Sequence, residues 1–331
     1  MARVVRFHRT GGPDVMQFDD LPVGNPQREE MRVRIEAIGL NRAEAMFRSG
    51  AYLEVPRLPA RLGYEASAII EAMGDGVDGF APGDAVSVIP AFSMNDYGVY
   101  ADTAIVPAYA VVQRPTGVSA IESAAVWMAY LTAWGALIDI GRLGRGEAVI
   151  ISAASSSVGL AAIQIANSVG AVPIATTRTR AKAAALTEAG AAHVVITSEQ
   201  EIGPAVSHAT GGKGARLVFD PIGGPQVEAL AQAMSHRGVM LIYGALATAP
   251  TPFPVIAAMQ KALTLRGYTL FEFIRDPQRL ARAAALIEDG LADGGLKPII
   301  AKTFPLDAIV QAHVYMESNE QFGKIVVTVP H

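Results

Sequence analysis

The 331-residue sequence contains no cysteine, which excludes disulfides, thiolate catalysis and cysteine-bound zinc. Charge is also scarce, because charged residues make up 18% of the chain and the formal net charge is -4, so nothing predicts a nucleic-acid partner. The most apolar stretches, such as 148–165, are interrupted by serine and glycine, and the N-terminus has the pattern of a strand. We therefore expect no membrane span, no signal peptide and, since the missing disulfides fit a reducing compartment, a cytoplasmic protein.

Apolar residues are abundant, at 51% of the chain, and 331 residues exceed the usual size of a single core, so two domains are expected. In the first ~115 residues, short apolar runs alternate with Gly- and Pro-containing turns, which is typical of a compact, partly open β-barrel. The strands expected there cover 31–40, 66–73, 85–89 and 100–106.

From residue 119 the pattern changes to an alanine-rich helical region and then to strands alternating with helices, which predicts a parallel, doubly wound sheet. Its six expected strands are 148–153, 171–176, 193–196, 215–219, 238–243 and 262–268. Asp276 and Pro277 indicate an N-cap and first turn of a helix that we expect to end at about 289, before Gly290. The tail, 299–331, returns to strand–helix–strand and could complete the first domain.

The turn after the strand at 148–153 is the most informative stretch for chemistry. Small residues followed by a helix start let the backbone approach a pyrophosphate, which the free N–H groups of the helix then bind. The usual signature of a dinucleotide-binding turn is G-x-G-x-x-G. This chain keeps only its last glycine, Gly159, and has Ala153 and Ser156 at the first two glycine positions. An ordinary strand–helix turn with a serine cap is the alternative.

The end of the next strand bears on the choice between NADP and NAD. An NAD site usually places an acid there, on the ribose hydroxyls, but no acid lies between Ala171 and Lys182. Threonines and three cations take its place, and a 2′-phosphate favours such charge-assisted donors. This pattern favours NADP(H); a solvated helix start with incidental Arg and Lys is the alternative.

The segment 155–166 (SSSVGLAAIQIA) closely resembles the cofactor turn of the zinc-independent medium-chain dehydrogenase/reductase superfamily, with the quinone oxidoreductase branch as the nearest match. Further motifs in the family order are 39–44 (GLNRAE), 48–52 (RSGAY), 63–67 (GYEAS), 82–86 (PGDAV) and 323–326 (GKIV). The resemblance implies an α/β fold with a GroES-like catalytic domain at 1–118 and 299–331, and a Rossmann NADP-binding domain at 119–298. It also implies a homodimer.

The departures from the family are equally informative. Zinc-dependent relatives carry a histidine at the position of Tyr64, and they also carry a cysteine near the position of Asn41; this chain has neither. Its six histidines show no metal spacing, so we expect no metal site. Without zinc, hydride addition is easiest to an activated acceptor whose negative charge delocalises onto oxygen. Met46 replaces a tyrosine common in some quinone reductases, which weakens the prediction of a quinone in particular.

The sequence therefore predicts an NADPH-dependent, zinc-independent reductase that transfers hydride to a quinone or an α,β-unsaturated carbonyl. The alternatives are an alcohol- or ketone-type dehydrogenase acting on a specialised catabolic substrate, and a non-catalytic nucleotide-binding protein. By resemblance, the candidate catalytic residues are Asn41, Tyr64 and Thr132. The alternative is a purely structural role, in which Asn41 caps a turn and the rings of Tyr52 and Tyr64 pack in the core. The candidate cofactor-binding residues are Tyr52, Ser155, Ser156, Ser157, Val158, Thr177, Arg178, Lys182, Thr197, Tyr243, Gly244, Ala245 and Phe271.

Overall fold

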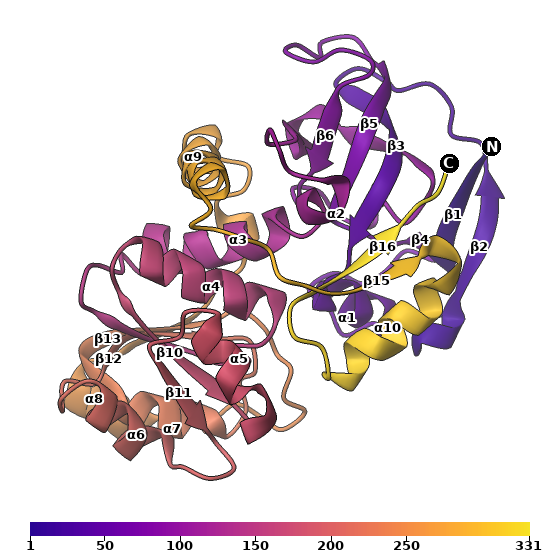
Figure 1. The fold of residues 1–331 in the computed structure, drawn as a ribbon. Coiled ribbons are helices and arrows are strands. Elements are labelled where there is room, and N and C mark those ends of the chain that lie inside the picture. Colours follow the sequence, from indigo (N-terminus) through magenta and orange to yellow (C-terminus); the bar gives the residue numbers. More distant parts are fainter. The chain divides into compact units, whose positions relative to one another are not determined.

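The computed structural model describes residues 1–331, which form two compact units (Figure 1). Unit 1 comprises Met1–Met128 and Pro298–His331, and unit 2 comprises Ala129–Lys297. The first boundary lies ten residues beyond the expected 118, because helix α2 (Ala120–Ser123) and the alanines that follow it pack on strands of unit 1. In that packing Ala124 and Ala125 contact Ala37 and Val326.

Unit 1 is rich in strands, as the sequence predicts, and most of its strand pairs are antiparallel. Its larger sheet has the order β15-β16-β3-β5-β6-β8, with β7 paired to β3, and its smaller sheet has the order β2-β1-β4. Strand β16 pairs with β3, so the two ends of the chain build one sheet. The strands are β1 (Ala2–Phe7), β2 (Met16–Leu21), β3 (Glu30–Gly39), β4 (Ala60–Arg61), β5 (Ala66–Met73), β6 (Ala85–Val88), β7 (Thr103–Pro107), β8 (Val111–Gln113), β15 (Ile300–Pro305) and β16 (Lys324–Thr328). The other helices of this unit are α1 (Arg42–Ser49) and α10 (Ile309–Ser318).

Unit 2 contains the doubly wound sheet that the sequence predicts. All its strand pairs are parallel, in the order β11-β10-β9-β12-β13-β14. The strands are β9 (Ala148–Ile151), β10 (Val172–Thr177), β11 (His193–Ile196), β12 (Ala215–Asp220), β13 (Met234–Ile242) and β14 (Thr264–Gly267). Because the strand order reverses between β9 and β12, their carboxyl ends flank the switch point where such sheets bind ligands.

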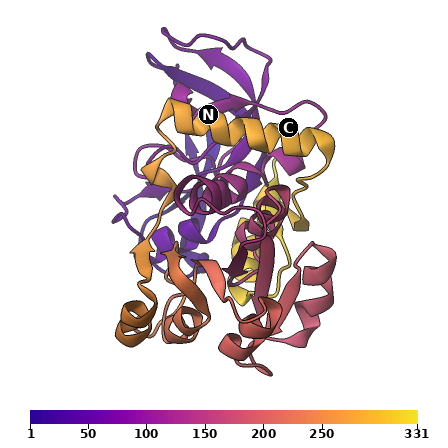
Figure 2. The same cartoon turned by 90° about the vertical axis from the view of Figure 1, so that its left-hand side faces the viewer.

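Helices cover both faces of this sheet (Figure 1; Figure 2 gives the view turned by 90°). Helices α6 (Ile202–Ala209), α7 (Gln226–Gln232) and α8 (Val255–Lys261) contribute side chains to one core cluster with the central strands. Helices α4 (Ser157–Ser168) and α5 (Ala183–Glu188) lie on the opposite face. The near-continuous apolar strands of the sequence are thus explained by burial on both faces.

The alanine-rich region 120–140 forms α2, then α3 (Trp127–Trp134), which continues into a π-helical segment, Gly135–Ile140. This stretch is the only one long and apolar enough to cross a membrane, with a mean hydropathy of 1.3. Within the fold, however, 83% of its most apolar window is buried. Its composition is therefore that of a core helix.

Helix α9 (Pro277–Asp293) begins as predicted but ends later than expected. The Asp276 carboxylate accepts hydrogen bonds from the backbone N–H groups of Gln278 (3.0 Å) and Arg279 (3.1 Å). The expected end at 289 is wrong, because Gly290 lies inside the helix, where a Cβ would stand 2.5 Å from the Cγ of Leu296. The glycine makes room for that leucine, and the helix instead ends at Asp293, with Gly294, whose φ is 80°, as its C-cap.

Candidate cofactor and active site

The turn between β9 and α4 has the geometry of a dinucleotide-binding turn although it lacks two of the glycines. Ala153, at the first glycine position, has a φ of 47°, in the left-handed region that glycine favours. Ser156 is the N-cap of α4, and its hydroxyl accepts a hydrogen bond from the N–H of Gly159 at 3.1 Å. The serine cap is therefore real, and the backbone follows the path of a glycine-containing turn as well.

Gly159, the one glycine retained, is required by packing. A Cβ at this position would lie 2.6 Å from both the Cα and the carbonyl oxygen of Ala154. The close approach seats the start of α4 against the end of β9. The N-terminal N–H groups of α4, around Ser157 and Val158, thus face the turn that Ser155 and Ser156 form, which is an arrangement suited to a phosphate.

The basic residues after β10 divide into one that reaches this turn, one that is engaged elsewhere and one that is exposed. Lys182 extends its Nζ to within 3.3 Å of the Ser155 hydroxyl, so a candidate 2′-phosphate ligand lies beside the candidate pyrophosphate turn. Arg180 forms an ion pair with Glu199. Arg178 is exposed.

Thr177 and Thr197 lie side by side at the carboxyl ends of β10 and β11. The backbone N–H of Thr197 donates to the Thr177 carbonyl at 2.9 Å, and its hydroxyl donates to the same oxygen at 3.3 Å. Thr197 is exposed at the carboxyl edge of the sheet, and its role as a ribose contact, which the family resemblance implies, stays a prediction.

Tyr243, Gly244 and Ala245 follow β13. The Tyr243 ring stacks on Phe219 with a centroid distance of 4.0 Å, and burial raises the pKa of its hydroxyl, which the nearby Ser156 side chain partly opposes. At Gly244 a Cβ would lie 2.6 Å from the carbonyl oxygen of Pro221, so no side chain fits there. Core packing of Tyr243 and proximity to the cofactor turn are thus both observed.

Asp220, which sequence reasoning did not single out, organises the switch point. This fully buried carboxylate accepts hydrogen bonds from the Ser152 hydroxyl (2.5 Å), the Gly223 N–H (2.8 Å) and the Gln226 amide (2.9 Å). Burial raises its pKa, and the hydrogen bonds oppose the rise. The sequence did contain a signal for this role, because an acidic residue ends an apolar strand directly before the turn Pro-Ile-Gly-Gly.

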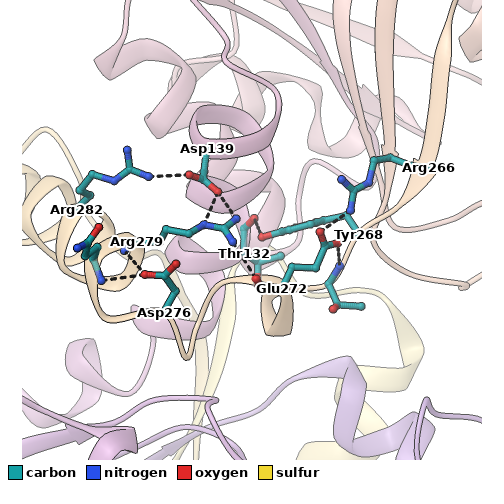
Figure 3. Close-up of polar contacts among 10 residues, drawn as sticks. Thr132, Asp139, Arg266, Tyr268, Glu272, Asp276, Arg279 and Arg282 are labelled. Carbon is teal, nitrogen blue, oxygen red and sulfur yellow. Dashed lines mark hydrogen bonds and ion pairs between the residues drawn. The ribbon is translucent and has the colours of Figure 1, made fainter.

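Thr132 and Phe271 lie in neighbouring segments of unit 2. Thr132 belongs to α3 and is 7% exposed, and its backbone carbonyl accepts a hydrogen bond from the Tyr268 hydroxyl at 3.0 Å (Figure 3). Phe271 lies in the short 3-10 turn Leu270–Glu272, three residues after Tyr268. These two candidates are therefore linked through Tyr268.

In unit 1, Asn41 is held from several directions. It is the N-cap of α1 in a capping box, in which Glu44 accepts from the backbone N–H of Asn41. Its side-chain amide donates to the Gly39 carbonyl at 3.0 Å, and its side-chain oxygen accepts from Lys324 at 2.7 Å. Asn41 thus caps α1, and Lys324 additionally fixes the orientation of its amide, while its catalytic role stays a prediction.

Glu65 and Lys324, which the sequence offered only as parts of motifs, form a buried ion pair. Their charged atoms lie 2.6 Å apart, and neither residue is more than 1% exposed. Glu65 also accepts from the backbone N–H of Met128 at 2.9 Å. The pair links β16 to the segment after β4 and, through Asn41, to the start of α1.

Tyr64 and Tyr52 are neighbours in the same unit, with ring centroids 6.4 Å apart. Tyr64 is completely buried, and its backbone N–H donates to Glu44 at 3.2 Å. Burial raises the pKa of Tyr64 strongly, and burial raises that of Tyr52 to about 12 against the opposing effect of the hydrogen bond to Tyr64. Both phenols are therefore neutral hydrogen-bonding groups over the ordinary pH range.

No group of three or more His, Asp or Glu side chains gathers closely enough to hold a metal ion. His313, the most buried histidine, instead shares a hydrogen bond of 3.1 Å with the Tyr100 hydroxyl. The absence of zinc from the reaction stays a prediction.

Two family models match the chain: the alcohol dehydrogenase GroES-like domain over residues 27–116 and the zinc-binding dehydrogenase model over residues 157–289. Quinone oxidoreductase 1 of Escherichia coli is 30% identical over 98% of this chain and 98% of its own length. A 2-haloacrylate reductase of a Burkholderia species is 28% identical over 99% of this chain and 98% of its own length. The crystal structure of Escherichia coli quinone oxidoreductase complexed with NADPH superposes with a TM-score of 0.91 at 29% identity, covering 99% of this chain and 100% of that one.

Proposed function

The chain belongs to the medium-chain dehydrogenase/reductase superfamily, in its quinone oxidoreductase-like branch, and is an NADP(H)-dependent oxidoreductase; we propose that it transfers hydride from NADPH to a quinone or an α,β-unsaturated carbonyl. The observation that carries the proposal is the contact between Lys182 and Ser155, because it sets a cation beside a phosphate-binding turn. NADPH would supply the hydride.

The residues of unit 2 fit this cofactor. Ala153 gives the turn its left-handed backbone, and Gly159 lets the start of α4 pack closely against Ala154, which is the strand–turn–helix geometry that binds a pyrophosphate in doubly wound folds. We assign the 2′-phosphate to Lys182 and Arg178, because these cations follow β10 where an NAD site would carry an acid. Ser155, Ser156, Ser157, Val158, Thr177, Thr197, Tyr243, Ala245, Phe271 and, from unit 1, Tyr52 are the remaining proposed cofactor contacts.

The proposed catalytic residues orient the acceptor and stabilise charge rather than ionise. Asn41, Tyr64 and Thr132 are the candidates, and the buried tyrosine is too weak an acid to lose its proton readily. The hydroxyl groups of Tyr64 and Thr132 are donors of the kind that stabilises an oxyanion as it develops on a quinone or enone. Both amide hydrogens of Asn41 are already donated to Gly39 and Glu44, so Asn41 would orient its neighbours rather than donate to the acceptor. The 2-haloacrylate reductase supports this acceptor class, since a haloacrylate is an α,β-unsaturated acid.

The remaining parts of the proposal concern zinc, assembly and location. We propose a zinc-independent reaction because the chain has no cysteine and has Tyr64 where zinc-dependent relatives carry histidine. A homodimer follows only from the family resemblance. A cytoplasmic location is consistent with the missing disulfides.

The test is NADPH oxidation by the purified protein, followed by absorbance, with 1,4-naphthoquinone, but-3-en-2-one and the saturated ketone butan-2-one. We expect turnover with the quinone, the enone or both, and none with butan-2-one. Lys182→Gln should raise the KM for NADPH, whereas Arg180→Gln, whose parent side chain is paired with Glu199, serves as the matched control. Turnover of butan-2-one alone would favour the alcohol- or ketone-type dehydrogenase, and binding without any turnover would favour a non-catalytic protein.

A further inference from the structure

The segment from Tyr268 to Arg282 joins the end of β14 to α9, and its polar side chains converge on α3 and the π-helical segment after it (Figure 3). Tyr268 is 2% exposed, and its backbone N–H donates to the Ile242 carbonyl at 2.9 Å. Its hydroxyl donates to the Thr132 carbonyl at 3.0 Å. Tyr268 therefore connects the sheet edge with the helix that carries Thr132.

Gly135 makes this contact possible. A Cβ at Gly135 would lie 2.3 Å from the Tyr268 hydroxyl and 2.3 Å from the Phe273 ring, so any other residue would displace both side chains. The same glycine begins the π-helical segment Gly135–Ile140, and such segments are frequent at functional sites. The helix is thus shaped locally to receive Tyr268.

Charged side chains hold the same two segments together one turn further on. The Asp139 carboxylate, whose side chain is 10% exposed, accepts hydrogen bonds from the Arg279 Nε at 3.0 Å and from an Arg282 guanidinium nitrogen at 2.9 Å. Arg279 also donates to the Glu272 carbonyl at 2.9 Å. Arg279 therefore connects Asp139 with the turn that contains Phe271.

The residues on both sides of Phe271 in that turn are held by contacts with the rest of the unit. Glu272 forms a capping box with Thr269 and an ion pair with Arg266 of β14, while Leu270 is buried. Phe271 lies between these two fixed neighbours. Its backbone is consequently fixed relative to Tyr268 and, through the Tyr268 hydroxyl, relative to Thr132.

We propose that Tyr268 is a positioning residue that holds Thr132 and Phe271 at a fixed spacing for the nicotinamide half of NADPH. The inference rests on the proposed function for the identity of the cofactor. Tyr268 does not touch the reacting atoms; it acts through the Thr132 backbone. Arg178 and Lys182, the residues proposed for the adenosine end of the cofactor, follow β10, and their positions do not depend on this hydrogen bond.

The experiment compares two ligands, NADPH and adenosine 2′,5′-bisphosphate, which lacks the nicotinamide half. Tyr268→Phe removes one hydroxyl and keeps the ring, and Tyr315→Phe is the matched control, since Tyr315 is a partly buried tyrosine that packs on Phe304. We expect Tyr268→Phe to raise the Kd of NADPH by more than about twofold and at most about fivefold, since the loss of one hydrogen bond within the protein sets the upper limit, and to leave that of the bisphosphate within about twofold. The control should change neither.

Gly135→Ala should reproduce the same pattern by pushing the hydroxyl away, and thermal unfolding checks that each variant is folded. Equal weakening of both ligands by Tyr268→Phe, or no weakening of NADPH, would overturn the inference. With 1,4-naphthoquinone as acceptor, kcat should also fall in Tyr268→Phe. If the parent protein binds NADPH but reduces no acceptor, the proposed function fails while the two-ligand comparison still decides the role of Tyr268.

Discussion

Replacing Glu44 by glutamine should change how the stability of the protein depends on pH. Glu44 is fully buried, and burial raises its pKa to about 7, although Lys324 and the hydrogen bonds from Asn41 and Tyr64 act against the rise. In the unfolded chain the same carboxyl titrates near 4.5. The folded state therefore binds the extra proton between these values, and the contribution of Glu44 to stability decreases as pH rises through that window.

His313, linked to Glu44 through the Tyr100 hydroxyl, has the opposite effect. Burial, followed by the charges of Arg48 and Arg42, lowers its pKa to about 3 from 6.5. The unfolded chain binds the extra proton in this case, so the contribution of His313 to stability is present above 6.5 and is lost as pH falls toward 3.

The interval from about pH 5 to about pH 6 lies between the folded-state and unfolded-state pKa values of both Glu44 and His313. Their opposite effects on stability therefore nearly cancel there in the parent protein. One proton changes the free energy of unfolding by about 1.4 kcal/mol per pH unit, so each group contributes about 1 kcal/mol over this interval, with opposite signs. Relative to the parent, Glu44→Gln should become more stable by about 1 kcal/mol on going from about pH 5 to about pH 6. His313→Gln should lose a similar amount.

The assay is urea unfolding followed by circular dichroism at the two pH values, with each variant compared with the parent at the same pH. The differences isolate the two groups, because all other titrating residues are common to the proteins. The reasoning is refuted if the two variants shift the pH dependence in the same direction, or if neither shifts it.

Two further outcomes follow from close packing and buried charge. Gly159→Ala should destabilise the protein by about 1–3 kcal/mol and weaken NADPH binding, because the new methyl group would meet the Ala154 backbone at 2.6 Å; thermal unfolding and a fluorescence titration measure both effects, and an unchanged melting temperature would contradict the packing argument. Lys324→Met should cost about 3–5 kcal/mol, because Glu65 would be left buried and unpaired, whereas the double variant with Glu65→Gln should recover part of that loss in urea unfolding.

Much of the fold was predictable because its signals are local. Apolar runs bounded by turns gave β5 and β11 their observed bounds, and the small residues at 153–159 indicated the strand–turn–helix that the structure contains. The errors arose where a distant residue decides the local structure. Gly290 marks no helix end because Leu296 fills the space beside it, and α2 joins unit 1 because its alanines fit against Ala37 and Val326.

The candidate site was predictable in its residue types but not in its supports. Asn41 and Tyr64 were named, and Glu44 meets Asn41 through a local capping box, yet its contact with Tyr64 and the contact of Lys324 with the Asn41 amide join residues from different elements. The Tyr268 contact with Thr132 spans 136 residues of sequence. Such pairings depend on tertiary structure, so periodicity and short motifs contain no signal for them.

The central claim is that the chain binds NADP(H) through the cations after β10, and a fluorescence titration with NADPH and NADH tests it most directly. We expect NADPH to bind at least about tenfold more tightly, as charge-assisted hydrogen bonds to the 2′-phosphate require. Lys182→Gln and Arg178→Gln should each remove most of that preference, and Arg180→Gln should retain it. Equal or tighter binding of NADH by the parent protein would contradict the account.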